Sequence, residues 1–293
     1  MQAIAPSLKK EKITAEIHQL PEAFKLMSRS QYDVFLVPAA AIPTVLQEIG
    51  RLREITFRAV GEGTGKERDI DAFDEFFHNL FIWDREAQQI VGGYRLGFGQ
   101  ELADAYGVAG HYISTLFDIE PEAYPLLRQS LELGRSYVIP AYQKGYLPFF
   151  LLWRGILLTL IRHPQYRYLI GPVSISKFYS DVCKSMIVQF VKRYYYDQEL
   201  AQSFHPRTPF LPKVQEMELD KITGQRLQDL ETFLANIEPE HMKLPIMLKQ
   251  YTKLNARFIS FNLDPNFSDA LDGLMILNLA DLPPNIIQLL EEK

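Results

Sequence analysis

The sequence predicts an α/β protein with a mixed, mainly antiparallel central sheet flanked by helices. Two short apolar runs, residues 79–84 and 89–96, are joined by a polar turn and indicate a β-hairpin. Strand-like and helix-like patterns then alternate from residue 131 to residue 196. The tail repeats this alternation from residue 245 to residue 279, and an α/β sheet with an antiparallel front half follows.

The front half begins with a polar stretch. Residues 1–20 are expected to form a short, mobile leader, and residues 21–293 a single domain, because no linker, repeat or low-complexity tract divides them. Residues 40–60 place apolar side chains near a 3.6-residue period, which predicts a helix. Residues 61–69 follow as a loop that leads toward the hairpin.

The back half alternates between strands and helices. Strands are expected at residues 131–139 and 168–174, and helices at residues 147–161 and 177–196. Residues 147–161 are very apolar but too short to span a bilayer, and Arg154 stands at their centre, so a buried helix is the interpretation. In the tail, the apolar pattern predicts a helix at residues 245–254, a strand at 256–263 and a second strand at 274–279.

Composition excludes several classes of protein. The chain of 293 residues carries 31 basic and 36 acidic side chains, net −5, which argues against a nucleic-acid-binding surface. The single cysteine, Cys183, excludes an intrachain disulfide framework and a cysteine-based zinc cluster, and it fits a reducing compartment. We therefore expect a cytoplasmic protein, free or peripheral on the inner face of the membrane, with no metal and no covalently bound cofactor.

Charge is distributed unevenly along the chain. Residues 134–196 contain nine basic residues and one acidic residue, Asp181, so this segment is net +8 and the rest of the chain is net −13. A positive region attracts an acidic carrier protein, a phosphate-bearing cofactor or an anionic membrane surface. The alternative is that these residues balance acidic neighbours in the folded protein.

Three familiar catalytic motifs are incomplete. Residues 61–66, GEGTGK, lack the first glycine of a phosphate-binding loop and have Glu67 where its Ser or Thr belongs. Residues 174–177 spell S-x-x-K, but no K-T-G accompanies them, and no G-x-S-x-G elbow is present. These patterns therefore do not assign a function.

One set of spaced polar residues does match a known pattern: Arg53-x-x-x-Phe57, Asp71-x-x-Asp74-x-x-x-His78, Gly92-Gly93-Tyr94-Arg95 and Glu132-x-x-Arg135. With these motifs the sequence resembles the acyl-homoserine-lactone (autoinducer) synthases. It resembles more closely the "hemolysin-like" N-acyltransferases that include the ornithine-lipid and glycine-lipid synthases, which share the GNAT fold. The closer resemblance runs from residue 52 to residue 282 and includes the stretches DIDAFDEFFHNLFIWD, VGGYRL, LELGRSYVIPAYQ, LLWRGI, YLIGPVSIS and the tail from residue 245.

The resemblance implies a bacterial enzyme of lipid biosynthesis. Such an enzyme transfers a fatty acyl group, usually 3-hydroxyacyl, from acyl carrier protein to the amine of glycine or ornithine, and the product is a lyso-aminolipid. Acyl-CoA is the alternative donor. Two other functions stay open: an autoinducer-type synthase that uses S-adenosylmethionine, and a noncatalytic module that binds the carrier protein or a membrane.

The same resemblance implies residues for catalysis. Amide formation needs a base for the amine and donors for the oxyanion. Glu132 is the first candidate for the base, although it is as well suited to a salt bridge with Arg135 or Arg95. His78 is the second candidate, oriented by Asp74 if the two share a helical turn.

Substrate contacts are implied as well. The donor is expected to meet basic side chains and the turn before the apolar helix: Arg53, Arg95, Arg135, Lys144 and Gly145. Asp71 and Asp74 are the candidates for the ammonium of the acceptor. An acyl tunnel is expected among Phe57, Phe149, Leu152 and Trp153, with plain core packing as the alternative. The tail has Gln250 and Asn255 where the family pattern KGYLKLGA has glycines, so this helix is expected to end differently.

Overall fold

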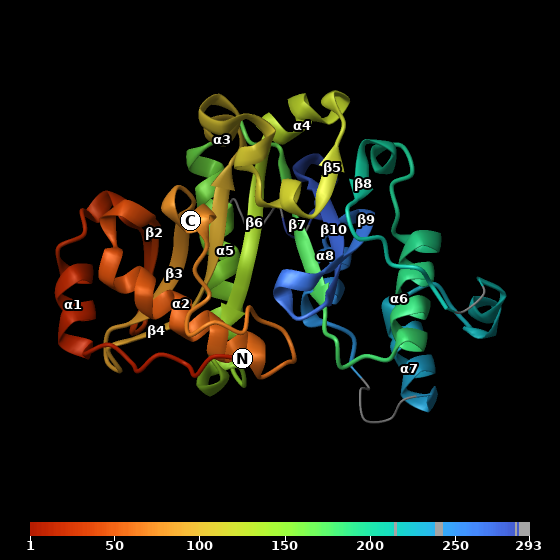
Figure 1. The fold of residues 1–293 in the computed structure, drawn as a ribbon. Coiled ribbons are helices and arrows are strands. Elements are labelled where there is room, and N and C mark those ends of the chain that lie inside the picture. The colour runs from red at the N-terminus through yellow and green to blue at the C-terminus, as the bar shows by residue number, and fades with distance from the viewer. Residues whose placement is uncertain (214–215, 238–242, 285, 287–293) are drawn as a thin grey trace.

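The computed structural model describes residues 1–213, 216–237, 243–284 and 286, and its centre is an eight-stranded sheet (Figure 1). The strands lie in the order β1-β2-β3-β4-β6-β7-β10-β9. Their bounds are β1 (Lys25–Arg29), β2 (Tyr32–Pro38), β3 (His78–Asp84), β4 (Gln89–Phe98), β6 (Ser130–Val138), β7 (Tyr168–Ile175), β9 (Arg257–Asp264) and β10 (Ala270–Asn278). All neighbours pair antiparallel except β6 and β7, which are parallel. The expected mixed, mainly antiparallel sheet is confirmed.

Helices cover both faces of this sheet. Their bounds are α1 (Lys10–His18), α2 (Pro43–Arg58), α3 (Gly99–Tyr106), α4 (Tyr124–Arg128), α5 (Leu147–Arg162), α6 (Asp181–Tyr194), α7 (Leu227–Ile237) and α8 (Ile246–Lys253). Helices α5 to α8 share one hydrophobic core with the sheet, and α1 and α2 form a second core on the opposite face. We call these faces the α5 face and the α2 face. A small second sheet pairs β5 (Phe117–Ile119) with β8 (Phe204–Pro206).

Most expected elements are present, with two differences in the first 40 residues. The predicted hairpin is β3–β4, and the helix predicted at residues 40–60 is α2. Strands β1 and β2 were not expected. The leader, residues 1–20, is not separate from the domain: Ile13 and Ile17 of α1 are buried against it. The last residues of the expected domain, 287–293, lie outside the described part.

Helix α1 is attached to the start of α2 by a side chain. The Glu16 carboxylate accepts hydrogen bonds from the backbone N–H groups of Thr44 and Val45, at 3.0 and 2.6 Å. These N–H groups belong to the first turn of α2, where a helix has unpaired donors and a carboxylate is stabilised. The first 20 residues therefore contribute to the packing of the domain.

The sheet splits between its two parallel strands. Only Ser130–Glu132 of β6 pair with Tyr168–Ile170 of β7, and beyond these three rungs the strands separate (Figure 1). Gly171 stands at the start of the split, where a Cβ atom would lie 2.1 Å from the carbonyl oxygen of Leu133. The missing side chain lets the two backbones touch immediately before they diverge.

A β-bulge in β6 orients the side chains at this split. Residues three apart on a regular strand point to opposite faces, so Glu132 and Arg135 would be separated by the sheet. The register between β4 and β6 shifts here, and Arg135 has the left-handed φ of 51°. The extra residue brings Arg135 to the α2 face, where Glu132 also lies.

Candidate active site

Six charged side chains form a closed ring on the α2 face beside the split. Each arginine contacts two aspartates and each aspartate contacts two arginines, and the members are Arg53, Arg95, Arg135, Asp69, Asp71 and Asp74. The N–O distances run from 2.5 Å for Arg95–Asp71 to 3.5 Å for Arg53–Asp69. We call this set the arginine–aspartate ring. Its charges cancel, which is the condition under which six ions can be buried together.

The ring is closed to solvent on one side and open on the other. The side chains of Arg53, Arg95, Asp69 and Asp74 are 0–1% exposed, whereas Arg135 is 9% and Asp71 24% exposed. Burial opposes the ionisation of Asp74, but Arg53 and Arg95 outweigh it and hold the pKa of this carboxyl at about 2. Asp74 is therefore an ionised structural group. That Asp74 binds the acceptor's ammonium stays a prediction; its side chain is 1% exposed and both its oxygens contact arginine.

Glu132 binds the segment that covers the ring. Its two carboxylate oxygens contact His111 Nδ1 at 2.9 Å and the Ile113 backbone N–H at 3.0 Å, and the side chain is 1% exposed. The expected pairing of Glu132 with Arg135 or Arg95 is not found, since both arginines bind aspartates instead. Sequence reasoning missed His111, which no motif marks.

His78 and Asp74 are not a pair. His78 begins strand β3, whereas Asp74 lies in a 3₁₀ turn before it, so the helical i, i+4 arrangement is absent. The His78 ring packs edge-on against Phe98, 4.7 Å between ring centroids, on the α5 face. Burial, with a smaller contribution from His163, lowers the pKa of His78 to about 4. The imidazole is neutral at pH 7 but lies on the other side of the sheet from the ring.

A second polar cluster lies across the split from the ring, and sequence reasoning missed it. The Ser174 hydroxyl of β7 donates to Asp272 Oδ1 of β10 at 2.6 Å, and the Tyr112 hydroxyl donates to Asp264 Oδ2 at 3.2 Å. The Arg135 guanidinium connects the two groups, stacking 4.8 Å from the Tyr112 ring centroid. The signal in the sequence was a single carboxylate, Asp272, inside the apolar run ALDGLMILN.

On the α5 face, a pocket of about 290 Å³ runs along α5 toward α8. Phe149 and Trp153, two of the four expected acyl-tunnel residues, line it. The other two do not: Leu152 is buried in the core, and Phe57 packs against Phe267 on the α2 face. For these two residues the core-packing alternative holds.

The turn before α5 carries the expected donor residues Lys144 and Gly145, both exposed. It connects the end of β6 to the first turn of α5, at the open end of the split. At the end of α8, Asn255 adopts a left-handed φ of 66° and its side-chain amide donates to the Asp281 carbonyl at 2.8 Å. Asparagine thus closes this helix where the family pattern has glycine.

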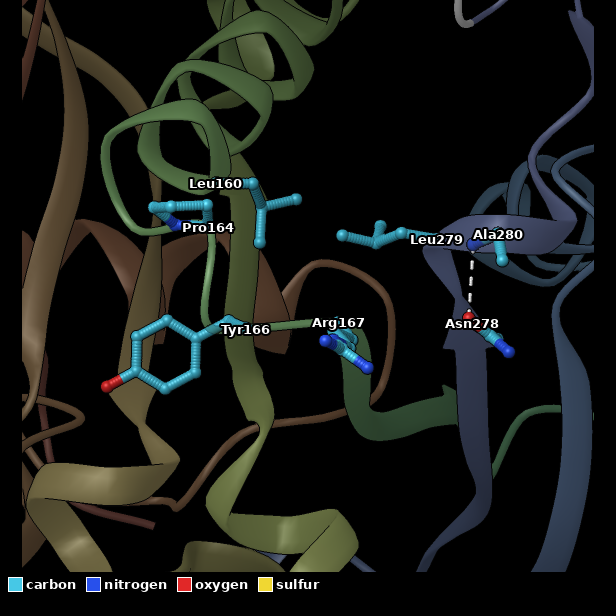
Figure 2. Close-up of a pocket in the computed structure, with 7 residues that line it drawn as sticks. All are labelled: Leu160, Pro164, Tyr166, Arg167, Asn278, Leu279 and Ala280. Carbon is cyan, nitrogen blue, oxygen red and sulfur yellow. Dashed lines mark hydrogen bonds between the residues drawn. The ribbon is translucent and has the colours of Figure 1, made fainter.

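Figure 2 shows a pocket of about 410 Å³ at the opposite end of the sheet, where β7 begins. Its lining residues are Leu160, Pro164, Tyr166, Arg167, Asn278, Leu279 and Ala280. None of them is a candidate site residue, so we place the active site at the split. Within the described residues, no group of three His, Cys, Asp or Glu side chains is arranged to hold a metal ion. No helix in that part of the chain has the length and apolar character needed to cross a bilayer.

Comparison with known proteins agrees with this geometry. Residues 52–153, from α2 to the middle of α5, match the family of the acetyltransferase (GNAT) domain. This segment holds the ring, strand β6 on one side of the split, and the turn before α5. The chain therefore has the fold of the GNAT acyltransferases, and its resemblance to the N-acyltransferases is confirmed.

Two curated relatives extend the similarity over most of the chain. Both are named glycine N(alpha)-acyltransferase. The one from Bacteroides thetaiotaomicron is 29% identical over 282 residues, 91% of this chain and 82% of that protein. The one from Phocaeicola vulgatus is 29% identical over 287 residues, 91% of this chain and 85% of that protein. Among solved structures, a CoA-dependent acyl-homoserine lactone synthase, BjaI, with MTA, is 12% identical over 88% of this chain and 86% of that chain, with a TM-score of 0.41.

Proposed function

We propose that this protein transfers a fatty acyl group, of the 3-hydroxyacyl type, from acyl carrier protein to the amine of glycine. The product is the lyso-aminolipid N-acylglycine. The observation that carries the proposal is the split between β6 and β7, which has charged groups on the α2 face and an apolar pocket on the α5 face. A thioester arm inserted between the strands meets both environments, one for a charged amino acid and one for an acyl chain.

The donor side supports a carrier-bound substrate. The turn at Lys144 is exposed and basic, and it follows the strand that forms one wall of the split. An acidic carrier protein is attracted to such a positive segment. On the acceptor side, Arg135 and Asp71 are the accessible members of the ring, and they suit the carboxylate and the ammonium of glycine respectively. Arg53 and Arg95 then hold the ring together.

The test is an acyl-transfer assay with purified protein and 3-hydroxyacyl carrier protein. Glycine, ornithine and S-adenosylmethionine are offered in turn, and products are identified by mass spectrometry; acyl-CoA replaces the carrier in a parallel series. N-acylglycine formation with release of the carrier thiol is the expected result. Release of methylthioadenosine would instead identify an autoinducer-type synthase, and binding without transfer to any amine would identify a noncatalytic module.

A variant tests the acyl pocket. Trp153→Ala removes about 2 kcal/mol of apolar contact, so KM for long-chain donors should rise roughly 30-fold while short-chain donors are unaffected. The matched control is Ile161→Ala on the same helix, whose side chain is 57% exposed. Equal behaviour of the two variants toward long chains would exclude this pocket as the acyl site.

A further inference from the structure

Asp272 is a buried carboxylate with an incomplete set of partners. It lies in β10 opposite Ser174 of β7, the strand that forms one wall of the split, and it is 2% exposed. The Ser174 hydroxyl satisfies Oδ1, and among the described residues no group donates a hydrogen bond to Oδ2. Oδ2 is not among the buried side-chain atoms that lack a partner, so this oxygen still touches solvent and is the one that a ligand can reach.

The charged groups around Asp272 come from every side of the split. Arg135 of β6 is the cation, but it is already bound by Asp69 and Asp71. Asp264, at the end of β9, adds negative charge. Glu62, from the loop after α2, is a further carboxyl group that interacts with Asp272. Among the residues that the structure describes, Asp272 consequently shares its one cation, Arg135, with two other carboxylates.

This environment favours a carboxylate that accepts a proton. Burial raises the pKa of Asp272 to about 7; the Ser174 hydrogen bond and Arg135 act in the opposite direction, and Asp264 adds to the rise. Burial and Asp272 itself raise the pKa of Glu62 to about 8. A group that titrates near neutral pH serves well as a general base.

We propose that Asp272 is the general base of the acyl transfer and takes a proton from the acceptor's ammonium through Oδ2. The assignment rests on the proposed function, since it supplies the step that an amine acceptor requires. Ser174 is a positioning residue that holds the carboxylate by Oδ1. Glu132, the base expected from sequence, has both oxygens bound to the segment above it and acts as a structural group.

The step balances as follows. The acceptor's ammonium gives one proton to Asp272, and the neutral nitrogen attacks the thioester carbonyl. The C–N bond forms and the C–S bond breaks, and the thiolate leaves with the electron pair of the C–S bond. The nitrogen loses a second proton to the thiolate, and Asp272 returns its proton to water, so the products are an amide, a thiol and one proton.

The variant Asp272→Asn keeps the size and the Ser174 hydrogen bond but cannot accept the proton. We expect kcat with glycine to fall by about 100-fold or more, while the melting temperature does not fall, because a buried charge is removed. The matched control is Asp269→Asn in the same β9–β10 hairpin. Asp269 is exposed and has a left-handed φ of 55°, which asparagine tolerates, so its activity should equal that of the wild type.

The pH profile separates a base from a structural carboxylate. The wild-type kcat/KM should fall on the acid side of pH 7, as Asp272 is protonated. Ser174→Ala removes the hydrogen bond that favours ionised Asp272 and so raises the pKa of this carboxyl. The acid limb of the kcat/KM profile should therefore move to higher pH.

Three outcomes decide the matter. A large loss in Asp272→Asn together with a shifted limb in Ser174→Ala supports the assignment. The base assignment is overturned, and the proposed function is kept, if the wild type is active and Asp272→Asn is as active as Asp269→Asn. The same conclusion follows if the acid limb of the kcat/KM profile does not move in Ser174→Ala. A folded wild type that acylates no amine overturns the proposed function and this assignment with it.

Discussion

The arginine–aspartate ring predicts a large stability loss from one conservative substitution, Asp74→Asn. The interaction with Arg53 and Arg95 lowers the pKa of Asp74 from its ordinary value of 3.8 to about 2. This difference corresponds to roughly 2 to 3 kcal/mol, at about 1.4 kcal/mol for each pH unit. The variant also leaves the ring with one unbalanced positive charge, and breaking a buried ion pair costs about 3 to 5 kcal/mol. We expect a total loss of about 3 to 4 kcal/mol at pH 7, because the two figures describe overlapping effects.

The pH dependence has a definite sign. A carboxyl whose pKa is lowered on folding stabilises the protein fully above the unfolded value, and this contribution is lost as the pH falls through the folded value. The difference between wild type and Asp74→Asn should therefore be full at pH 7 and should shrink between pH 4 and pH 2.

The assay is urea unfolding followed by circular dichroism at several pH values, with the slope m checked for constancy. The matched control is Asp220→Asn, which removes an ion pair to Arg193 whose side chains are 66% and 35% exposed. That loss should stay below about 1 kcal/mol. If Asp74→Asn were no more destabilising than Asp220→Asn at pH 7, the ring would not be a major source of stability.

Two further predictions concern the split and its cover. Gly171→Ala places a Cβ against the Leu133 carbonyl and should lower the free energy of unfolding by about 2 to 3 kcal/mol, measured by thermal unfolding. The control is Gly134→Ala, whose Cβ has no neighbour nearer than 4.0 Å, and equal losses in the two variants would refute the close approach. Glu132→Gln should cost about 1 to 3 kcal/mol and speed hydrogen exchange at the Ile113 amide, while the acid limb of kcat/KM stays in place. If the acid limb of kcat/KM disappeared in Glu132→Gln, Glu132 would be the general base instead of Asp272.

The sequence predicted helices whose apolar side chains repeat near every 3.6 residues, and strands that are apolar runs beside a polar turn. The β3–β4 hairpin and the helices α2, α5 and α8 follow their patterns closely. Strand β2 is buried from Tyr32 to Val37 and shows no alternation, and it was missed because its hairpin partner β1 is only partly buried, so no second apolar run flanks the turn. Helix α1 was missed because only Ile13 and Ile17 carry its packing, within a polar stretch.

The candidate site was predicted as a list of residues but not as a set of contacts. The spacing of Asp71, Asp74, Arg95 and Arg135 identified the polar residues of the α2 face, yet their mutual pairing depends on three separate segments meeting in space. The bulge at Arg135 also hid the contacts of the site, because no sequence pattern revealed that Glu132 and Arg135 lie on the same face of the sheet. Asp272 was missed because its environment is made by Ser174, nearly 100 residues earlier in the chain.

The three-rung pairing of β6 with β7 divides the sheet into two mechanical units. Each half keeps a continuous antiparallel ladder, β1-β2-β3-β4-β6 on one side and β7-β10-β9 on the other. In the described part of the chain, strand pairing joins the two ladders at Ser130–Glu132 and Tyr168–Ile170, next to the backbone hydrogen bonds that Gln129 accepts from Arg167 and Tyr168. The amides of these rungs should therefore exchange with solvent ahead of those inside either half. A substrate that bridges the strands ties the two units together, so binding should be detectable as slower exchange along this seam.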